Sequence, residues 1–364
     1  MNILEIFAAA DWGGGEQFVF DLSETLIEKG NQVVCVSKKS EVIVARLVSL
    51  KCNYFVLPMK GVFDFYSAFF LRRIIQKNNI QIIHVHDFKT LFPIVYGCLF
   101  LKSKPKIIVS RHLAKKAKTN CIYHRLYHQI DTLIFVSDFA KQKFLSTHPK
   151  IDLNKCIVIH NSIKEHVENE SINFREKFNL EESTAILAFT GRLVKEKGVH
   201  VLIRALALLK SQNFILLIAG VGDSAYRQEL ENIIFENQLE EKVKFLGFVK
   251  NITSLVQQAH IGIFPSIQPE AFGLSIIEFM KEGKAVIASD NGAQPEFITP
   301  LKTGILVKPN DSTTLTEQID FLLSNPVFRE QLGAAGKTCF ENRLSYPQFY
   351  EKITDAFNIK GSPL

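Results

Sequence analysis

The sequence predicts an α/β protein built from two doubly wound domains, each around a parallel sheet. Short runs of β-branched and other apolar residues alternate with amphipathic segments along most of the chain. The length of 364 residues exceeds what one hydrophobic core usually holds. A polar, acidic stretch at residues 161–183 interrupts the alternation, which then restarts. Because strand–helix alternation at this spacing forms right-handed βαβ units, both sheets are expected to be parallel.

The first half of the chain contains the strands and helices of one domain. Each strand is a short apolar run, and strands are predicted at residues 3–8, 32–37, 53–57, 81–86, 106–110, 132–136 and 156–159. Helical periodicity fills the intervals at residues 16–29, 63–77, 90–101, 120–129 and 137–146. The first of these helices stops at Gly30, a residue type that commonly ends helices in the left-handed conformation.

The second half repeats this organisation after the polar stretch, where we place the linker. Its predicted strands are residues 185–189, 214–219, 243–245, 260–265, 285–288 and 304–307. The tail, residues 312–358, is helical by its pattern. A second parallel sheet covered by helices is therefore expected.

Composition and cysteine usage indicate a globular cytoplasmic protein. The chain is 47% hydrophobic and 22% charged, which is not the composition of a disordered protein. Its six cysteines are scattered without metal-ligand or redox spacing, which favours buried free thiols in a reducing compartment. The first residues lack the basic segment of a signal sequence, and the longest apolar run, residues 91–101, is too short to span a bilayer. We therefore expect a protein that is not integral to a membrane.

The net charge of +6 is concentrated in one basic stretch, residues 102–125, which has no acidic residue. Such a stretch attracts an anionic membrane surface, a phosphorylated acceptor or nucleic acid. Nucleic acid is disfavoured because no aromatic platform or binding module accompanies the charge. A solvated basic face is the alternative.

Two carboxylates mark the loop and helix that follow a predicted strand in the second half. Glu270 stands after the strand at residues 260–265, and Glu278 is placed about one and a half turns into the next helix, on its exposed face. Open α/β sheets bind ligands at the carboxyl ends of strands, and a helix start offers free backbone N–H groups. Because carboxylates accept hydrogen bonds from hydroxyl pairs, the pattern favours a sugar or ribose site. A helix cap and a solvated surface residue are the alternative interpretation.

A basic motif at residues 190–198 follows the strand at residues 185–189. Gly191 allows a tight exit from the strand, Arg192 offers a planar fork, and Lys197 offers a mobile point charge. At a helix N-terminus this pair suits a diphosphate. Two solvated basic residues on a loop are the alternative.

Together, in this order and spacing, the two motifs resemble the retaining glycosyltransferases of the GT-B fold, family 4. Shorter pieces along nearly the whole chain match as well, among them Gly13-Gly14-Gly15-Glu16, His84-Val85-His86, Val109-Ser110-Arg111-His112 and Phe245-Leu246-Gly247-Phe248-Val249. The resemblance implies an acceptor-side domain of residues 1–165 and a donor-binding domain of residues 166–344. It also implies that residues 345–364 return to the first domain as a helix.

The resemblance assigns roles to four residues treated as catalytic. Arg192 and Lys197 match the pair that holds the donor diphosphate and neutralises the charge growing on it as the glycosidic bond breaks. Glu270 matches the carboxylate that contacts the sugar hydroxyls, and His112 matches a histidine that faces the donor sugar.

Other positions are expected to bind the donor. Glu278 matches the residue that binds the ribose hydroxyls, and the expected backbone donors beside the sugar are Phe272, Gly273 and Leu274. Gly14 and Gly15, in the first loop, would let the backbone approach a phosphate or the acceptor. Phe248 and Val249 match positions near the nucleobase, although Phe248 equally suits a core.

His84 and His86 alternate along a predicted strand, so only one of the two is expected to face inward. His86, followed by Asp87, is expected to lie nearer the ligand.

The mechanism implied by the resemblance is retention at the anomeric carbon, with front-face attack assisted by the leaving phosphate. Glu270 is therefore not assigned as a nucleophile. No metal and no other cofactor is expected, because the chain lacks an obvious Asp-x-Asp pair and Arg192 with Lys197 supplies positive charge instead.

The expected function is transfer of a hexose-type sugar from a nucleotide diphosphate sugar to a glycan or lipid-linked saccharide. The setting would be cell-envelope polysaccharide or lipopolysaccharide synthesis, in the cytoplasm or peripherally on the inner face of the cytoplasmic membrane. Two alternatives stay open: a sugar-nucleotide epimerase or phosphorylase of similar fold, and a catalytically silent scaffold. The nucleobase, donor sugar, acceptor and linkage cannot be read, because main-chain groups and apolar side chains shape those pockets.

Overall fold

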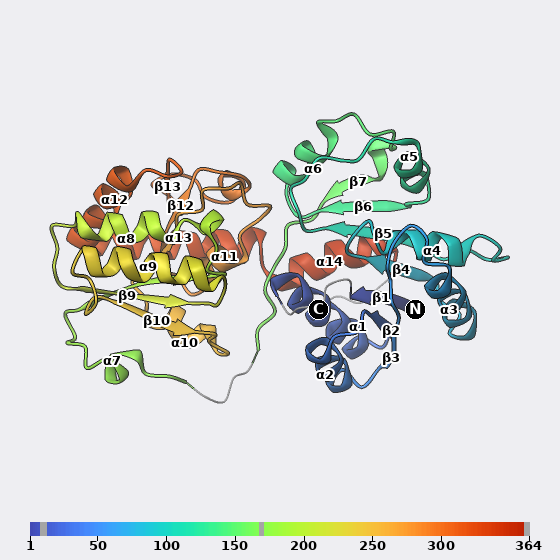
Figure 1. The fold of residues 1–364 in the computed structure, drawn as a ribbon, viewed down its shortest axis with the longest axis horizontal. Helices are drawn as coiled ribbons and strands as arrows, with labels where there is room; N and C mark the ends of the chain where they lie inside the picture. Colours follow the sequence, from blue (N-terminus) through green and yellow to red (C-terminus); the bar gives the residue numbers. More distant parts are fainter. Residues whose placement is uncertain (8–12, 167–170, 360–364) are drawn as a thin grey trace. The chain divides into compact units, whose positions relative to one another are not determined.

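The computed structural model describes residues 1–7, 13–166 and 171–359 of the chain. They form two compact units, Met1–Lys164 with Tyr346–Leu364, and Glu165–Ser345. Figure 1 shows that each unit is a sheet layered with helices. The predicted fold class, with two parallel sheets and alternating helices, is confirmed.

The sheet of the first unit is entirely parallel over the described residues, in the order β3-β2-β1-β4-β5-β6-β7. The strands are β1 Asn2–Phe7, β2 Gln32–Ser37, β3 Asn53–Val56, β4 Ile82–Val85, β5 Lys106–Arg111, β6 Thr132–Phe135 and β7 Cys156–Val158. Six of the seven match the predicted runs within about a residue at each end, because an apolar run bounded by turns is a strong local signal. The seventh, β1, was predicted to reach Ala8, which lies outside the described residues.

Helices cover this sheet in the intervals between strands. They are α1 Gly14–Glu28, α2 Glu41–Ser49, α3 Phe65–Lys77, α4 Leu91–Cys98, α5 Cys121–His128 and α6 Asp138–Leu145. Gly30 follows α1 at φ +81°, as predicted for a helix-ending glycine. The helix α2 was missed by the sequence analysis, although Ser40 caps it by accepting from the backbone N–H of Ile43.

The last helix, α14 (Tyr346–Phe357), belongs to the first unit, although it lies at the far end of the chain. Phe349, Tyr350 and Phe357 are buried in the same core as α1 and β1. The Tyr346 hydroxyl donates to the Asp21 carbonyl at 3.0 Å. Apolar burial and this bond therefore hold the C-terminal helix against the first sheet.

The second unit has the strand order β10-β9-β8-β11-β12-β13, again parallel over the described residues. The strands are β8 Ala185–Thr190, β9 Phe214–Ala219, β10 Val243–Gly247, β11 Ile261–Phe264, β12 Ala285–Ser289 and β13 Ile305–Val307. The helices are α7 Phe174–Lys177, α8 Val199–Ala207, α9 Ser224–Glu236, α10 Ile252–Gln258, α11 Leu274–Lys281, α12 Ser312–Ser324 and α13 Pro326–Arg343.

The predicted linker at residues 161–183 is too long. The second unit begins at Glu165, and α7 lies inside the predicted linker. Phe174 is buried, and its backbone N–H donates to the Gln258 side chain at 2.8 Å. This part of the stretch is thus packed against the second unit, because one aromatic residue in a polar segment suffices to anchor it.

Each strand order reverses direction at one place. The reversal lies between β1 and β4 in the first sheet and between β8 and β11 in the second. At such a point, the loops that follow the two neighbouring strands run to opposite faces of the sheet. The crevice between these loops leaves room for a ligand. The predicted site residues lie in the segments that follow β1, β4, β8 and β11, and in the segments that follow the nearby strands β5 and β10. No helix in the described part of the chain is long and apolar enough to cross a bilayer.

Candidate active site

A salt bridge between a lysine and a glutamate lies just after the carboxyl ends of β8 and β11 in the second unit. Lys197 lies in a 3-10 turn after β8, and Glu270 lies on the loop between β11 and α11. The Lys197 Nζ is 2.8 Å from Glu270 Oε1, and both side chains are partly buried. The Ser266 hydroxyl also donates to Glu270 Oε1. The structure therefore brings together two of the four residues predicted to be catalytic.

Two glycines make this approach of the loops possible. Gly198 has φ +69°, and a Cβ there would lie 2.0 Å from the Pro265 carbonyl oxygen at the end of β11. Gly292 has φ +109°, and a Cβ there would lie 2.3 Å from the Glu270 carbonyl oxygen. Any larger residue would push the loops apart. Neither Gly198 nor Gly292 was predicted from the sequence to position these loops.

The helix α11 begins beside Glu270 without a side-chain cap. Gly273, the N-cap residue, has φ +114° and no side chain that could accept from the first N–H groups of the helix. The Phe272 ring is buried against Phe297, with ring centroids 5.3 Å apart. The predicted backbone donors Gly273 and Leu274 thus lie at an uncapped helix N-terminus, where partial positive charge favours an anion or a hydroxyl oxygen.

Glu278 departs from its prediction. It lies in the fifth position of α11 but is half-buried, not on an exposed face. Burial raises the pKa of its carboxyl to about 7, and Lys281 acts in the opposite direction. Because burial disfavours the charged form, the carboxylate is available as a hydrogen-bond acceptor mainly above neutral pH.

The other predicted residues of the second unit face solvent to different degrees. The Arg192 side chain is exposed after β8, and no ion pair joins it to a neighbour within the described ranges. Phe248 follows β10 and is 69% exposed, so the suggestion that it is a core residue is wrong. Val249 is half-buried beside it.

The glycines of the first unit do not lie in a loop as predicted. Gly14 and Gly15 are the first two residues of α1, and Gly13 takes the N-cap position. The helix therefore starts two residues earlier than expected. A Cβ on Gly15 would touch nothing within 4 Å among the described atoms, so packing does not require glycine here. Both glycines nevertheless place their backbone N–H groups at a helix N-terminus.

A buried hydrogen-bond network occupies the reversal point of the first sheet. Glu5, in the middle of β1, is fully buried, and its two carboxylate oxygens contact His84 Nδ1 at 3.0 Å and His86 Nε2 at 3.2 Å. His84 Nε2 contacts the Ser110 hydroxyl at 2.8 Å. His86 Nδ1 contacts His112 Nε2 at 3.1 Å. Glu5 is thus linked through His86 to a predicted catalytic residue.

These contacts fix which nitrogen of each ring carries the proton. Burial lowers the pKa of His84, His86 and His112 to about 3 each, so all three are neutral near pH 7 and each has one N–H. An ionised Glu5 only accepts, so His84 Nδ1 and His86 Nε2 donate to it. His86 Nδ1 then accepts from His112 Nε2–H.

As long as Glu5 is ionised, His112 therefore presents an unprotonated Nδ1. That atom is buried and has no hydrogen-bond partner among the described residues. A proton on the Glu5 carboxylate oxygen nearer His86 would reverse the direction of the hydrogen bonds from Glu5 through His86 to His112. His112 would then carry its proton on Nδ1 and present an N–H donor. Burial does raise the pKa of Glu5 above its ordinary value, although the bond from His86 opposes this.

The expectation that only one of His84 and His86 faces inward is wrong. The strand β4 ends at Val85, so His86 is free of the strand alternation and its ring turns back to Glu5. Glu5 itself was not among the predicted site residues. The available signal was a carboxylate inside the apolar run Ile3-Leu4-Glu5-Ile6-Phe7, which a half-buried strand would not carry without partners.

Comparisons with known proteins place both units in one enzyme family. The model of glycosyltransferase family 4 matches residues 12–166, and the model of the glycosyl transferases of group 1 matches residues 170–338. The crystal structure of Anabaena HepE in complex with UDP has a TM-score of 0.85 and 18% identity, covering 98% of this chain and 100% of that one.

The chain belongs to the GT-B glycosyltransferases of family 4.

Relatives with an assigned reaction are named for different sugars, mannose, N-acetylglucosamine and kanosamine among them. An uncharacterized glycosyltransferase of Methanocaldococcus jannaschii is 26% identical, over 93% of this chain and 92% of its own. The GDP-mannose-dependent monoacylated alpha-(1-6)-phosphatidylinositol monomannoside mannosyltransferase of Corynebacterium glutamicum is 27% identical, over 62% of each chain. Family membership therefore does not decide the donor of this glycosyltransferase.

The residue types of Glu5, His84 and His86 are also those of a metal site. In this glycosyltransferase both ring nitrogens of His84 and both of His86 already have hydrogen-bond partners. Each carboxylate oxygen of Glu5 accepts one of these bonds. In this arrangement the three side chains form a polar network that orients His112.

Proposed function

We propose that this glycosyltransferase moves a hexose from a nucleotide diphosphate sugar to a glycan or lipid-linked saccharide of the cell envelope, with retention at the anomeric carbon. The observation that carries the donor side is the Lys197–Glu270 pair beside the uncapped start of α11. An amine, a carboxylate and the N–H groups of a helix start lie together beside the reversal point of the second sheet. This combination suits a ligand that carries both phosphate and hydroxyl groups.

The comparisons support a nucleotide-linked donor. The crystal structure of HepE contains UDP, and the Corynebacterium mannosyltransferase is named as GDP-mannose-dependent and acts on a phosphatidylinositol mannoside. By analogy we propose a nucleotide diphosphate sugar as donor and a lipid-linked or envelope saccharide as acceptor. A peripheral position at the inner face of the cytoplasmic membrane would give access to such an acceptor.

In the proposed reaction Lys197 and Arg192 neutralise the diphosphate as the bond to the sugar breaks. Lys197 is held in place by Glu270 before the ligand arrives, which reduces the reorganisation needed on binding. Glu270 accepts from sugar hydroxyls, and the N–H groups of Gly273 and Leu274 donate. Glu278 accepts from the ribose hydroxyls when it is ionised, and Phe248 and Val249 lie beside the base.

The first unit contributes His112 and the start of α1 to the proposal. The free Nδ1 of His112 would accept a hydrogen bond from a substrate hydroxyl, because the network from Glu5 leaves it unprotonated. Gly14 and Gly15 would bring backbone N–H groups to a phosphate or the acceptor. The positive charge that the reaction needs comes, in this proposal, from Arg192 and Lys197, with no metal ion or other cofactor.

The test is thermal stabilisation by UDP, GDP and ADP. A nucleotide at ~100 times its dissociation constant should add about 2.7 kcal/mol to the free energy of unfolding. We expect a shift with one nucleotide in the wild type and in Lys195→Ala, and none in Arg192→Ala/Lys197→Ala. Lys195 is the matched control, because it lies in the same turn but pairs with Glu229.

Either result is informative. A shift confined to one base, followed by product analysis that shows the anomeric configuration, would establish the donor and the stereochemistry. If none of the three nucleotides stabilises the wild type, the donor assignment is wrong and a scaffold role gains support. Turnover of the donor to another nucleotide sugar without any acceptor would instead indicate an epimerase.

A further inference from the structure

A group of aromatic side chains is exposed on α3, in the turn before it and in the turn after α4, in the first unit. Phe63 is 85% exposed and Phe100 is 79% exposed. Three more aromatic side chains with over half of their surface exposed are Phe65, Tyr66 and Phe69. Because burying such a ring is worth about 2–3 kcal/mol, solvent exposure of so many in one region indicates a surface that binds something.

Local packing holds these rings on one rigid platform. A Cβ on Gly97 of α4 would lie 2.9 Å from the Ala68 carbonyl of α3, so the two helices are packed as closely as glycine allows. Phe65 stacks on Tyr96 of α4, with ring centroids 5.4 Å apart. Figure 1 shows α3 and α4 side by side at the edge of the first unit. Phe65, Tyr66 and Phe69 therefore belong to an ordered helix, and Phe63 and Phe100 lie in the turns directly before α3 and after α4.

The charged residues of this region are almost all basic. Arg73 lies over the Phe69 ring at 4.4 Å, and the Arg72 guanidinium donates to the Phe100 carbonyl at 3.4 Å. Exposed lysines of the same segments are Lys60, Lys77, Lys102 and Lys104. The acidic residue among them, Asp64, is buried, where it caps α3 and accepts from Lys60 N at 2.7 Å. We call these aromatic and basic residues the α3–α4 surface.

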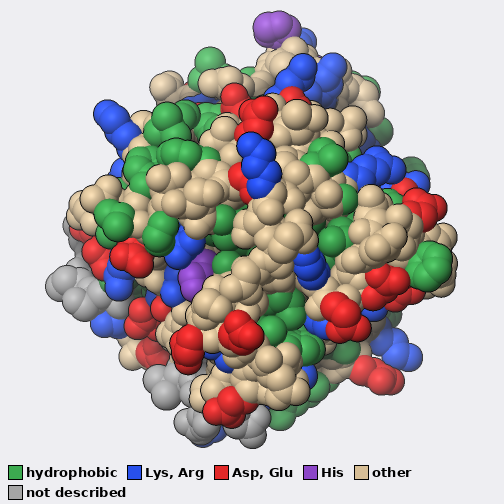
Figure 2. Space-filling view, turned by 90° about the vertical axis from the view of Figure 1, so that its left-hand side faces the viewer, with side chains coloured by type: hydrophobic (Ala, Val, Ile, Leu, Met, Phe, Trp, Pro, Cys, Tyr) green, Lys and Arg blue, Asp and Glu red, His purple; other side chains and the backbone are tan. Residues whose placement is uncertain are grey.

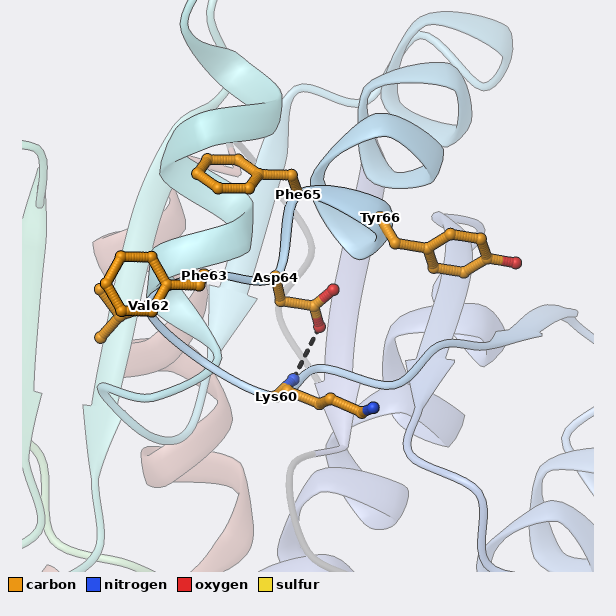
Figure 3. A pocket seen from close by; sticks show the side chains of 6 residues that line it. All are labelled: Lys60, Val62, Phe63, Asp64, Phe65 and Tyr66. Carbon is orange, nitrogen blue, oxygen red and sulfur yellow. Dashed lines mark hydrogen bonds between the residues drawn. The ribbon is translucent and has the colours of Figure 1, made fainter.

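Figure 3 shows the hollow at the start of α3. It has a volume of about 610 Å³ and is lined by Lys60, Val62, Phe63, Asp64, Phe65 and Tyr66. Phe63 and Val62 stand on one side and Tyr66 on the other, with the Asp64 carboxylate turned inward to the backbone N–H of Lys60. The face drawn in Figure 2, in contrast, carries Lys and Arg side chains interspersed with Asp and Glu.

We propose that the α3–α4 surface docks on an anionic lipid bilayer, with the aromatic rings in the interface and the cations at the headgroups. Exposed rings next to lysine and arginine match the two attractions that hold a peripheral protein on a membrane: apolar burial and attraction to anionic lipid. An acidic protein would match the charge but not the number of exposed rings. The inference rests on the proposed function in one respect: membrane docking would give the enzyme access to the lipid-linked acceptor proposed above.

This surface is not the basic stretch at residues 102–125, for which an anionic partner and a solvated face were both left open. Arg111, in that stretch, packs over Phe88 at 5.1 Å and donates to the Lys115 carbonyl at 2.7 Å. Its guanidinium is thus used within the protein. The proposed surface lies mainly before that stretch and shares only Lys102 and Lys104 with it.

The experiment is sedimentation of the full chain with vesicles of phosphatidylcholine alone and with vesicles that also contain the anionic lipid phosphatidylglycerol. We expect binding to the anionic vesicles. The variant Lys60→Gln/Arg73→Gln/Lys102→Gln should partition about 100-fold more weakly, at about fivefold for each cation lost. The variant Phe63→Ser/Phe65→Ser/Phe100→Ser should also lose binding.

Matched controls lie elsewhere on the protein. Phe235 is 72% exposed on α9, so Phe235→Ser removes an equally exposed ring. Lys143→Gln/Lys150→Gln removes two exposed cations of the first unit. Both controls should bind vesicles like the wild type. Circular dichroism and thermal unfolding check that every variant is folded.

Several outcomes would overturn the proposal. Wild type that binds neither vesicle, or surface variants that bind as well as the controls, would show that this surface does not dock on lipid. Self-association of the wild type in ultracentrifugation, abolished by the same variants without any vesicle binding, would identify a second copy as the occupant. Vesicle binding needs no nucleotide, so failure of the nucleotide shift would refute the proposed function and leave this result intact.

Discussion

Glu5→Gln is the substitution that most directly tests the network behind His112. Gln has nearly the same shape as Glu but carries one N–H2 group and one oxygen, so it cannot accept from both histidines. With its oxygen toward His84, its amide donates to His86 Nε2. His86 must then carry its proton on Nδ1 and donate to His112 Nε2. His112 would present an Nδ1–H where the wild type has a lone pair.

The size of the effect follows from one hydrogen bond. An acceptor that faces a substrate hydroxyl is replaced by a buried donor, and leaving a buried polar group without a partner costs about 1–3 kcal/mol. This free energy corresponds to a decrease of about 5- to 150-fold in kcat/KM for sugar transfer. A hydroxyl that can hand its proton to another acceptor would bring the loss to the lower end of this range.

The assay is the pH dependence of kcat/KM for the wild type, Glu5→Gln and Ser110→Ala. Burial raises the pKa of Glu5, so the wild type should lose activity on the acid side at a higher pH than an ordinary glutamate would cause, as the carboxylate takes up a proton and the branch to His112 reverses. The ratio of wild type to Glu5→Gln cancels all other titrations and should fall toward one as the pH decreases. Ser110 is the control, because it bonds His84 on the branch that does not lead to His112.

Equal activity of Glu5→Gln and wild type across this pH range would refute the deduction about His112. So would a loss in Ser110→Ala as large as that in Glu5→Gln, since this would mean that the network acts only by holding the fold.

The remaining predictions concern other residues. Glu278→Gln should weaken nucleotide binding increasingly as the pH rises through about 7, and a pH-independent ratio of dissociation constants would contradict this. The same variant should raise the melting temperature at pH 8 but not at pH 5, because the raised pKa of Glu278 means that its ionisation is disfavoured in the folded state. Gly198→Ala should lower the free energy of unfolding measured in urea by about 2–4 kcal/mol, because it adds a steric clash to a left-handed backbone. The control Gly30→Ala should cost about 1 kcal/mol, because Gly30 has φ +81° but open space around it. Similar losses in both variants would show that the loops can separate freely. Tyr346→Phe should cost about 1 kcal/mol by deleting the bond to the Asp21 carbonyl, and an unchanged urea midpoint would mean that apolar burial alone holds α14.

The sequence by itself determined the order of the elements and the two-sheet fold. Apolar period, turn residues and helix ends are local signals, so β4, β8 and the end of α1 at Gly30 follow from a few neighbouring residues. The same holds for the loops after strands, because parallel strands put their carboxyl ends on one edge of a sheet. Lys197 and Glu270 could thus be expected near each other without any structure.

Only the tertiary structure decided the chemistry of individual groups. Glu5 meets His84 across 79 positions of sequence, and no local pattern indicates which histidine nitrogen keeps its proton. The burial that raises the pKa of Glu278 depends on neighbouring elements, not on its place in α11. The exposure of Phe63 and Phe100 likewise depends on what the fold leaves uncovered, since an aromatic residue in a helical pattern is predicted to be core. Hydrogen-bond partners, desolvation and surface are properties of residues far apart in the chain, which is why they appear only once the chain is folded.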